Sequence, residues 1–174
     1  MGGVGRWGVK LEFLIIDANV LIDFCKTERS VLALVTTHVG ALHVTEPVLS
    51  EVKQLHRASA EALGINVLTV EFSMLSRAAE ASVRSPLRFQ DWLCLLVAEQ
   101  RSWTCVTNDK RLRRECESRD VAVLWGFQLL VRLVEQNALD AAEAIRIAEA
   151  ICQVNRRIPE VVLAAFRRKI RALR

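Results

Sequence analysis

The chain of 174 residues is poor in the residues that break regular structure, with three prolines and seven glycines. That shortage excludes collagen-like repeats and argues against disorder. No apolar run approaches the roughly 20 residues that span a bilayer. The amino terminus lacks the apolar core of a signal peptide, and it lacks the Ser or Thr expected at the sixth position of a myristoylation signal. We therefore expect a cytoplasmic protein without a membrane segment and with a flexible start at residues 1–8.

Metal-binding patterns of cysteine and histidine are also missing. The five cysteines are odd in number, scattered, and form no C-x-x-C pair. Most of them lie among aliphatic residues, which favours buried, reduced thiols over a metal cluster. The three histidines form no ligand spacing either. The sequence thus gives no support for a zinc site.

Charge of one sign is concentrated at the carboxyl end. Residues 156–174 contain seven basic residues against Glu160, a formal charge of +6, whereas the remaining residues sum to −2. This split suggests that the tail binds a polyanion or an acidic partner. A solvated helix face is the alternative. The basic residues of the last predicted helix are Arg167, Arg168, Lys169, Arg171 and Arg174.

Apolar and β-branched stretches alternate with helical patterns over the first 125 residues. The predicted strands are 9–16, 41–44, 65–72, 103–106 and 121–125. The predicted helices between them are 19–26, 30–37, 46–55, 73–81, 88–100 and 110–118. This alternation indicates an α/β fold with a parallel sheet and right-handed crossovers. Beyond residue 125 only helices are predicted, at 127–136, 140–153 and 159–173.

Capping signals mark two of these helices. Thr45 with Pro47 in the first turn predicts the start of the helix at 46–55, and Asp140 with Glu143 predicts a capping box. In the last helix an apolar stripe with arginines opposite predicts one buried face. The members of that stripe are Val162, Phe166, Ile170 and Leu173.

Four acids lie at the ends of predicted strands or in helices that also carry core-facing residues, and Asp91 begins a nearly continuous apolar run where charge is ordinarily excluded. Asp17 and Asp109 follow the first and fourth predicted strands, and the carboxyl ends of such strands form the ligand-binding edge of a parallel sheet. Glu51 and Asp91 lie in helices that carry core-facing residues. Two of these acids have a simpler interpretation, since Asp17 can cap a helix and Asp91 can interact with a helix dipole. These interpretations explain four acids in one α/β layout less well than a shared site does.

Carboxylates held together repel one another, and their desolvation is costly without compensation. A divalent cation supplies that compensation, and a site of oxygen ligands without His or Cys favours Mg²⁺ or Mn²⁺. Such a cation binds phosphate and activates water for attack on phosphorus. The predicted site therefore indicates phosphodiester hydrolysis.

Other α/β proteins fit these residues poorly. The turn after the first strand has no glycine, so the G-x-G-x-x-G pattern of dinucleotide binding is absent. The sequence contains no P-loop. A phosphatase of the haloacid-dehalogenase type requires Asp two residues after Asp17, where this chain has Asn19. The order of acids and lysine in a receiver domain does not match either.

Four stretches together resemble the motifs of PIN-domain ribonucleases. They are IDANVLID (16–23), PVLSEV (47–52), QDWLCLLVA (90–98) and VTNDKRL (106–112), and their order and separation also fit the family. The resemblance covers residues 11–125. It implies a three-layer α/β/α sandwich with a five-stranded, mainly parallel sheet, and Mg²⁺- or Mn²⁺-dependent endonuclease activity, usually on RNA.

Within this resemblance, each matching position has an implied role. The four acids match the acidic tetrad of the family, which implies that they bind metal and carry catalysis: Asp17, Glu51, Asp91 and Asp109. Thr107, Asn108 and Asn19 match supporting polar positions. Asp23 matches a frequent acid of the first helix, and we expect it to support the fold or a partner contact.

The chain departs from the family after the last acid of the tetrad. Many members have a further acid there, whereas this chain is basic, which leaves open how a second metal would be held. The basic residues are Lys110, Arg111, Arg113 and Arg114. They are candidate contacts to an RNA backbone, as are Arg167, Arg168, Lys169 and Arg171. A solvated helix face is the alternative for both groups.

Many small prokaryotic PIN proteins are VapC-type toxins, which form homodimers and are silenced by an antitoxin protein. This chain is longer than most of them. We predict a nuclease domain at 9–136 and a helical extension at 137–174, which weakly resembles an extension in another prokaryotic PIN subgroup. The expected partners are RNA, a second copy of the chain and, in the toxin interpretation, an antitoxin. A non-catalytic PIN module that binds RNA or protein is the alternative function.

Overall fold

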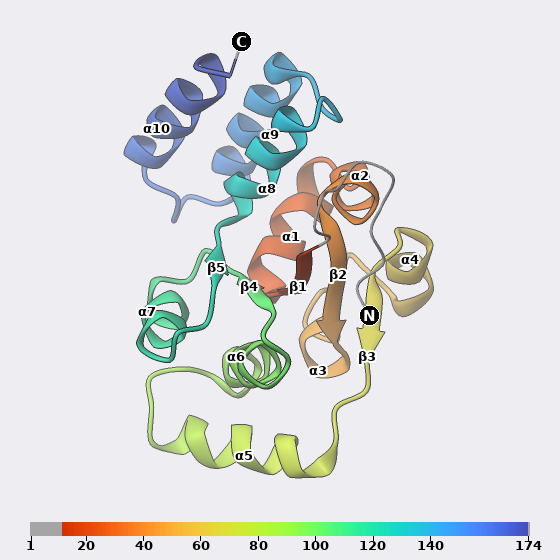
Figure 1. The fold of residues 1–174 in the computed structure, drawn as a ribbon, viewed down its shortest axis with the longest axis vertical. Helices are drawn as coiled ribbons and strands as arrows, with labels where there is room; N and C mark the ends of the chain where they lie inside the picture. The colour runs from red at the N-terminus through yellow and green to blue at the C-terminus, as the bar shows by residue number, and fades with distance from the viewer. Residues whose placement is uncertain (1–11, 174) are drawn as a thin grey trace.

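A computed structural model of the chain describes residues 12–173, which form a five-stranded sheet covered by helices (Figure 1). The strand order is β3-β2-β1-β4-β5, and all neighbouring strands are parallel. The strands are β1 (Glu12–Ile16), β2 (Gly40–Thr45), β3 (Asn66–Leu68), β4 (Thr104–Val106) and β5 (Val123–Leu124). The predicted α/β class with a parallel sheet is confirmed. The prediction of a flexible start at residues 1–8 lies outside the described residues.

Helices lie on both sides of the sheet (Figure 1). On one side α6 contacts β1, β2 and β4, and α5 lies outside α6. On the other side α2 contacts β2, and α8 and α9 pack against α2 and α1. The helices are α1 (Ala18–Thr27), α2 (Ser30–His38), α3 (Glu46–Leu49), α4 (Arg57–Ala62), α5 (Phe72–Val83), α6 (Phe89–Arg101), α7 (Lys110–Ser118), α8 (Gly126–Glu135), α9 (Ala141–Val154) and α10 (Glu160–Arg171). None of the described helices is both long and apolar enough to cross a membrane.

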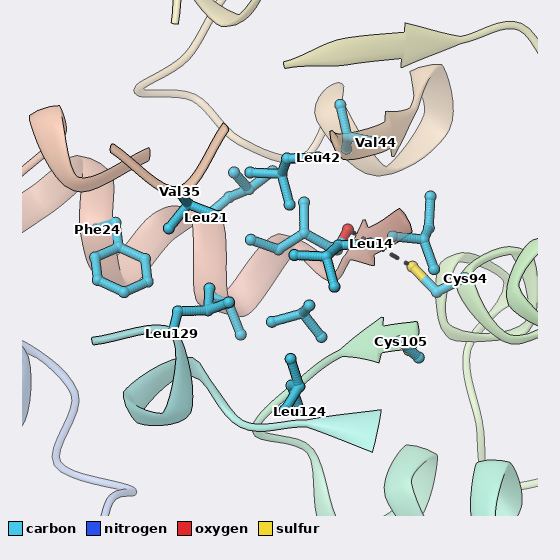
Figure 2. Packing of buried hydrophobic residues seen from close by; sticks show 14 of the residues in the cluster. Leu14, Leu21, Phe24, Val35, Leu42, Val44, Cys94, Cys105, Leu124 and Leu129 are labelled. Carbon is cyan, nitrogen blue, oxygen red and sulfur yellow. Dashed lines mark hydrogen bonds between the residues drawn. The ribbon is translucent and has the colours of Figure 1, made fainter. Parts of the chain in front are cut away.

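Strand β1 lies at the centre of the sheet and of the hydrophobic core (Figure 2). Leu14 is fully buried and pairs with Leu42 of β2 and Thr104 of β4. Figure 2 shows Leu21, Phe24 and Leu129 on one side of Leu14 and Cys94 on the other. A strand buried on both faces requires a continuous apolar run, and the sequence LII before Asp17 provides it. Of the five free cysteines, Cys94, Cys105 and Cys116 are buried as predicted, whereas Cys25 and Cys152 are half-buried.

The carboxyl-terminal helices share this core. Leu163, Phe166 and Ile170 of α10 are buried, and the rings of Phe127 and Phe166 lie 5.1 Å apart between centroids. Leu163 takes the place that we predicted for Val162 and Leu173, since Val162 is half-buried and Leu173 is 36% exposed. Asp140 caps α9 as predicted, because its carboxylate accepts hydrogen bonds from the first turn of the helix. The predicted capping box is not closed, since the Glu143 side chain pairs with Arg146. The division into segments 9–136 and 137–174 stays a prediction.

The predicted helix at 46–55 is wrong. The helix α3 ends at Leu49, and turns lead into α4, which the sequence did not predict. Val48 and Val52 are nevertheless buried, because the N–H of Val52 donates to the carbonyl of Leu49 in a tight turn that keeps both side chains in the core. Thr45 makes no side-chain capping bond. The predicted strand at 65–72 shortens to β3.

Candidate active site

Asp17 lies where β1 ends and α1 begins, and its side chain is fully buried. Its backbone N–H donates to the carbonyl of Val106 at 3.0 Å, which fixes the residue between β1 and β4. Carboxylate atom Oδ2 accepts a hydrogen bond of 3.1 Å from the Thr107 hydroxyl. Atom Oδ1 is buried and has no hydrogen-bond partner among the described residues. Asp17 makes no side-chain capping bond to α1, so helix capping does not account for it.

Burial and a neighbouring acid raise the pKa of Asp17 to about 7. Desolvation is the larger cause, and repulsion from Asp91 is the next. The hydrogen bond from Thr107, the charge of Arg88 and the backbone N–H of Ala18 act in the opposite direction without cancelling the shift. The ionised carboxylate is therefore under-compensated near neutral pH, as expected for a group that binds a cation.

Asp91 and Glu51 approach the same place from α6 and from the turn after α3. Asp91 is 6% exposed. Its Oδ2 accepts a bond of 2.9 Å from the backbone N–H of Arg88, and its Oδ1 lies 3.3 Å from the Arg88 guanidinium. The same guanidinium lies 3.4 Å from Glu51. Asp91 therefore makes the contacts expected of an acid at the start of a helix. It also lies close enough to Asp17 to repel it, and it shares the Arg88 guanidinium with Glu51.

Asp109 is joined to Asp17 through Thr107. The Thr107 hydroxyl donates to Asp17 and accepts a bond of 3.0 Å from the backbone N–H of Asp109. The Asp109 side chain caps α7, because its Oδ1 accepts bonds of 2.8 Å from the N–H groups of Arg111 and Leu112. Both bonds use one oxygen, which leaves Oδ2 as a potential ligand.

Within residues 12–173, no three side chains of the His, Cys, Asp or Glu type are arranged as a metal site. The chemistry of the donor set nevertheless fits a divalent cation. Asp17 presents a buried oxygen without a partner, Asp91 lies close enough to raise its pKa, and the exposed part of Arg88 provides the local positive charge. Oxygen donors of this kind suit Mg²⁺ and Mn²⁺. A cation there would substitute for the charge of Arg88.

The supporting residues hold the surrounding backbone. Asn108 accepts a bond of 2.9 Å from the N–H of Gly126, where a Cβ atom would approach the Asn108 amide to 3.2 Å. Asp23 is 5% exposed, and both of its oxygens accept hydrogen bonds from Asn155 of the extension, at 3.1 and 3.0 Å. Asn19 lines a hollow together with Asp109.

The basic residues divide into free and engaged groups. Arg113 donates to the carbonyl of Asn108 and stacks 3.6 Å above the Trp125 ring, and Arg167 forms ion pairs with Glu149 and Glu160. Both guanidiniums are therefore held within the molecule. The others are exposed on α7 and α10: Lys110, Arg111, Arg114, Arg168, Lys169 and Arg171.

Sequence reasoning missed Arg88 and Asn155. The position of Arg88, three residues before Asp91, was the available sequence signal for a cation beside Asp91 and Glu51. No comparable signal pointed to Asn155, which pairs with a residue 132 positions away. The described chain is thus an α/β domain with acids at the carboxyl edge of its parallel sheet and beside the start of α6.

Residues 14–117 match the PIN domain, and the chain belongs to this family. PIN domains are generally nucleases. Two solved archaeal structures are similar to it. One is a PilT N-terminus domain protein, SSO1118, from Sulfolobus solfataricus P2, with 12% identity, a TM-score of 0.49 and coverage of 68% of this chain and 91% of that protein. The other is PAE2754 from Pyrobaculum aerophilum, with 22% identity, a TM-score of 0.49 and coverage of 72% and 97%. No curated protein matches the chain.

Proposed function

We propose that this protein is an endoribonuclease that hydrolyses RNA phosphodiester bonds with Mg²⁺ or Mn²⁺. The observation that carries the proposal is the buried Oδ1 of Asp17, which lies near Asp91 and has no hydrogen-bond partner within residues 12–173. An ionised carboxylate in that setting costs free energy unless a cation or a hydrogen-bond donor satisfies it. Membership of the PIN family supports the same activity.

Each residue of the site has a proposed role. Asp17, Asp91 and Asp109 would hold the metal, and Glu51 would bind it directly or through water and orient the attacking water. When bound, the metal supplies neutralisation of phosphate charge and lowers the pKa of water. Thr107 positions two of the acids, since its hydroxyl contacts Asp17 and the backbone of Asp109.

Cleavage of RNA by purified protein tests the proposal. Wild-type protein should cleave a mixed RNA substrate with Mg²⁺ or Mn²⁺ and lose activity in EDTA. Asp17→Asn should be inactive, whereas Asp23→Asn is the matched control because Asp23 is another buried acid, six residues further along the chain in α1. Metal-dependent cleavage that is unchanged in Asp17→Asn would contradict the proposed mechanism.

The alternative function is a non-catalytic PIN module that binds RNA or a protein. One observation favours it: the Arg88 guanidinium bridges Glu51 and Asp91 within the acid cluster. In such a module the arginine is the permanent counter-charge of the acids. A metal titration separates the two functions, because an inert module shows no metal-dependent turnover even where it binds RNA.

A more specific form of this proposal is that the nuclease is the toxin of a toxin–antitoxin pair. It requires an antitoxin protein and, as in the VapC type, a homodimer. Co-expression with the product of an adjacent small reading frame should abolish RNA cleavage and form a stable complex. Light scattering of the purified chain should give the mass of a dimer, and a monomer at micromolar concentration would contradict that part of the proposal.

A further inference from the structure

We infer that a hollow between Trp125 and the segment 157–159 binds one nucleotide of single-stranded RNA, with the base on its apolar wall and the phosphate at its cationic rim. This inference rests on the proposed function and names the form of substrate that the same site receives. The hollow brings the extension into the substrate-binding surface.

The hollow lies between the PIN core and the extension. It has a volume of about 240 Å³. Its apolar wall consists of Trp125, Phe127, Ile158, Pro159 and Val162, and the cations at it are Lys110, Arg113 and Arg157. No acid lines it. An apolar wall with an aromatic ring and a purely cationic rim complements a ligand that is both aromatic and anionic.

Trp125 is held in place for stacking. Trp125 is 37% exposed, and the Arg113 guanidinium lies 3.6 Å from the centroid of its ring. Arg113 is itself fixed by its bond of 2.7 Å to the carbonyl of Asn108. Preorganised aromatic and guanidinium planes are the surfaces on which unpaired bases stack in RNA-binding proteins.

A second hollow connects this pocket with the acidic site. Its volume is about 400 Å³, and it shares Lys110, Asn108, Arg157 and Ile158 with the first. It extends to Asn19 and Asp109, where the acidic site begins. Lys110 and Arg157 therefore border both hollows. An RNA strand that places a base against Trp125 has its backbone along these two cations, with the next phosphates directed toward Asp109.

Single-stranded RNA is favoured over a duplex because bases must leave a stack to reach an aromatic wall. An acidic peptide would use the cations but would not need the aromatic wall. The contribution of the base therefore distinguishes these ligands, and it can be measured apart from catalysis.

The first test measures binding of a fluorescent oligouridine in EDTA, where cleavage does not contribute. Arg157→Gln should weaken binding and reduce the slope of log Kd against log salt by about 0.7, the value for one phosphate contact on a single strand. Arg156→Gln is the matched control. It removes the same charge from the neighbouring residue, whose side chain lines neither hollow. Equal effects of the two substitutions would overturn the inference.

The second test concerns the base. Trp125→Leu should weaken oligouridine binding about tenfold, as expected for one lost stacking contact, and should leave binding of an abasic oligomer of the same length unchanged. Phe72→Leu, at an aromatic that is 82% exposed, is the control. Unchanged oligouridine binding in Trp125→Leu, or displacement of the RNA by polyglutamate at equal charge concentration, would overturn the inference.

A cross-linking measurement on the wild-type protein removes dependence on the folding of any variant. An oligonucleotide with a single 4-thiouridine should cross-link to peptides that contain Trp125 or residues 157–159. Cross-links confined to other peptides would overturn the inference. Because all three measurements concern binding, their failure together with normal RNA cleavage would refute the pocket alone, and success without cleavage would refute the nuclease alone.

Discussion

Two buried aspartates of one segment have opposite surroundings. Asp23, within α1, has both oxygens bonded to Asn155, and burial raises its pKa while Asn155, Asn108 and Lys26 lower it. Asp17, at the start of the same helix, has one bonded oxygen and one without a partner among the described residues. It also faces another acid, Asp91.

The difference separates a structural acid from a candidate site acid. At Asp23 the protein provides donors from its own extension, so the carboxylate fastens α9 to α1 and is satisfied. At Asp17 the protein provides burial and repulsion and leaves an oxygen open. Burial by itself does not mark a functional acid; incomplete satisfaction does.

The largest expected difference is in RNA cleavage. Asp17→Asn should reduce the rate by more than about 100-fold, because even residues that only support metal ligands cost about 10- to 100-fold when replaced. Asp23→Asn should stay within about fivefold of the wild type, since one hydrogen bond to Asn155 can remain. Initial rates at saturating Mn²⁺ measure both. Equal losses would remove the distinction between the two acids.

The substitution Asp17→Asn, which should abolish cleavage, should raise the free energy of unfolding of the metal-free protein at neutral and higher pH. The unfolded carboxyl titrates near 3.8 and the folded one at about 7, so the folded state binds the extra proton between these values. The contribution of Asp17 to the free energy of unfolding of the metal-free protein should therefore fall as pH rises from about 4 to 7, by up to about 4 kcal/mol, and should not fall further above that range.

Asp17→Asn carries no such proton. In EDTA it should be more stable than the wild type at pH 8, and this advantage should disappear near pH 4. Urea unfolding at several pH values measures the difference. A difference that does not depend on pH would show that Asp17 titrates normally.

Removing the partner of Asp23 should destabilise the protein. Asn155→Ala removes the group that donates to both oxygens of this buried carboxylate, which costs about 1–3 kcal/mol. Asn155→Asp is a sharper variant, because it places a second acid there and should cost more. Urea midpoints report both effects. A neutral Asn155→Ala would mean that Asp23 does not fasten the extension.

Asp109 combines both kinds of surroundings, because its carboxylate caps α7 and adjoins the site. Asp109→Asn keeps a good cap and should change the free energy of unfolding by a few tenths of a kcal/mol, whereas Asp109→Ala should cost about 1 kcal/mol. Both variants should lose cleavage. Retained cleavage in Asp109→Asn would limit Asp109 to its capping role.

A small effect on stability is also expected at Arg88. Its ion pairs involve a side chain that is 52% exposed, and pairs of this kind contribute about 0–1 kcal/mol. Arg88→Gln should thus change stability little, but it removes the cation that competes with a metal and should tighten Mn²⁺ binding. Calorimetric titration measures this. Weaker binding in Arg88→Gln would show that the arginine supports the metal.

The sheet and the order of the acids could be predicted because they depend on local patterns. The run LII before Asp17 requires a strand buried on both faces, and the alternation with helices requires parallel neighbours. The helix at 46–55 failed because spacing of Val48 and Val52 on one side does not distinguish a helix from a turn that keeps the same side chains buried. The contact between Asp23 and Asn155 depends on how the extension folds back, which no local pattern contains.

Binding of Mn²⁺ to metal-free protein tests the central claim most directly. Calorimetric titration of the wild type, Asp17→Asn and Asp23→Asn at pH 8 should show binding to the wild type and to Asp23→Asn, and none to Asp17→Asn over the same range. Equal binding to all three proteins would contradict the assignment of Asp17 as the open ligand of the site.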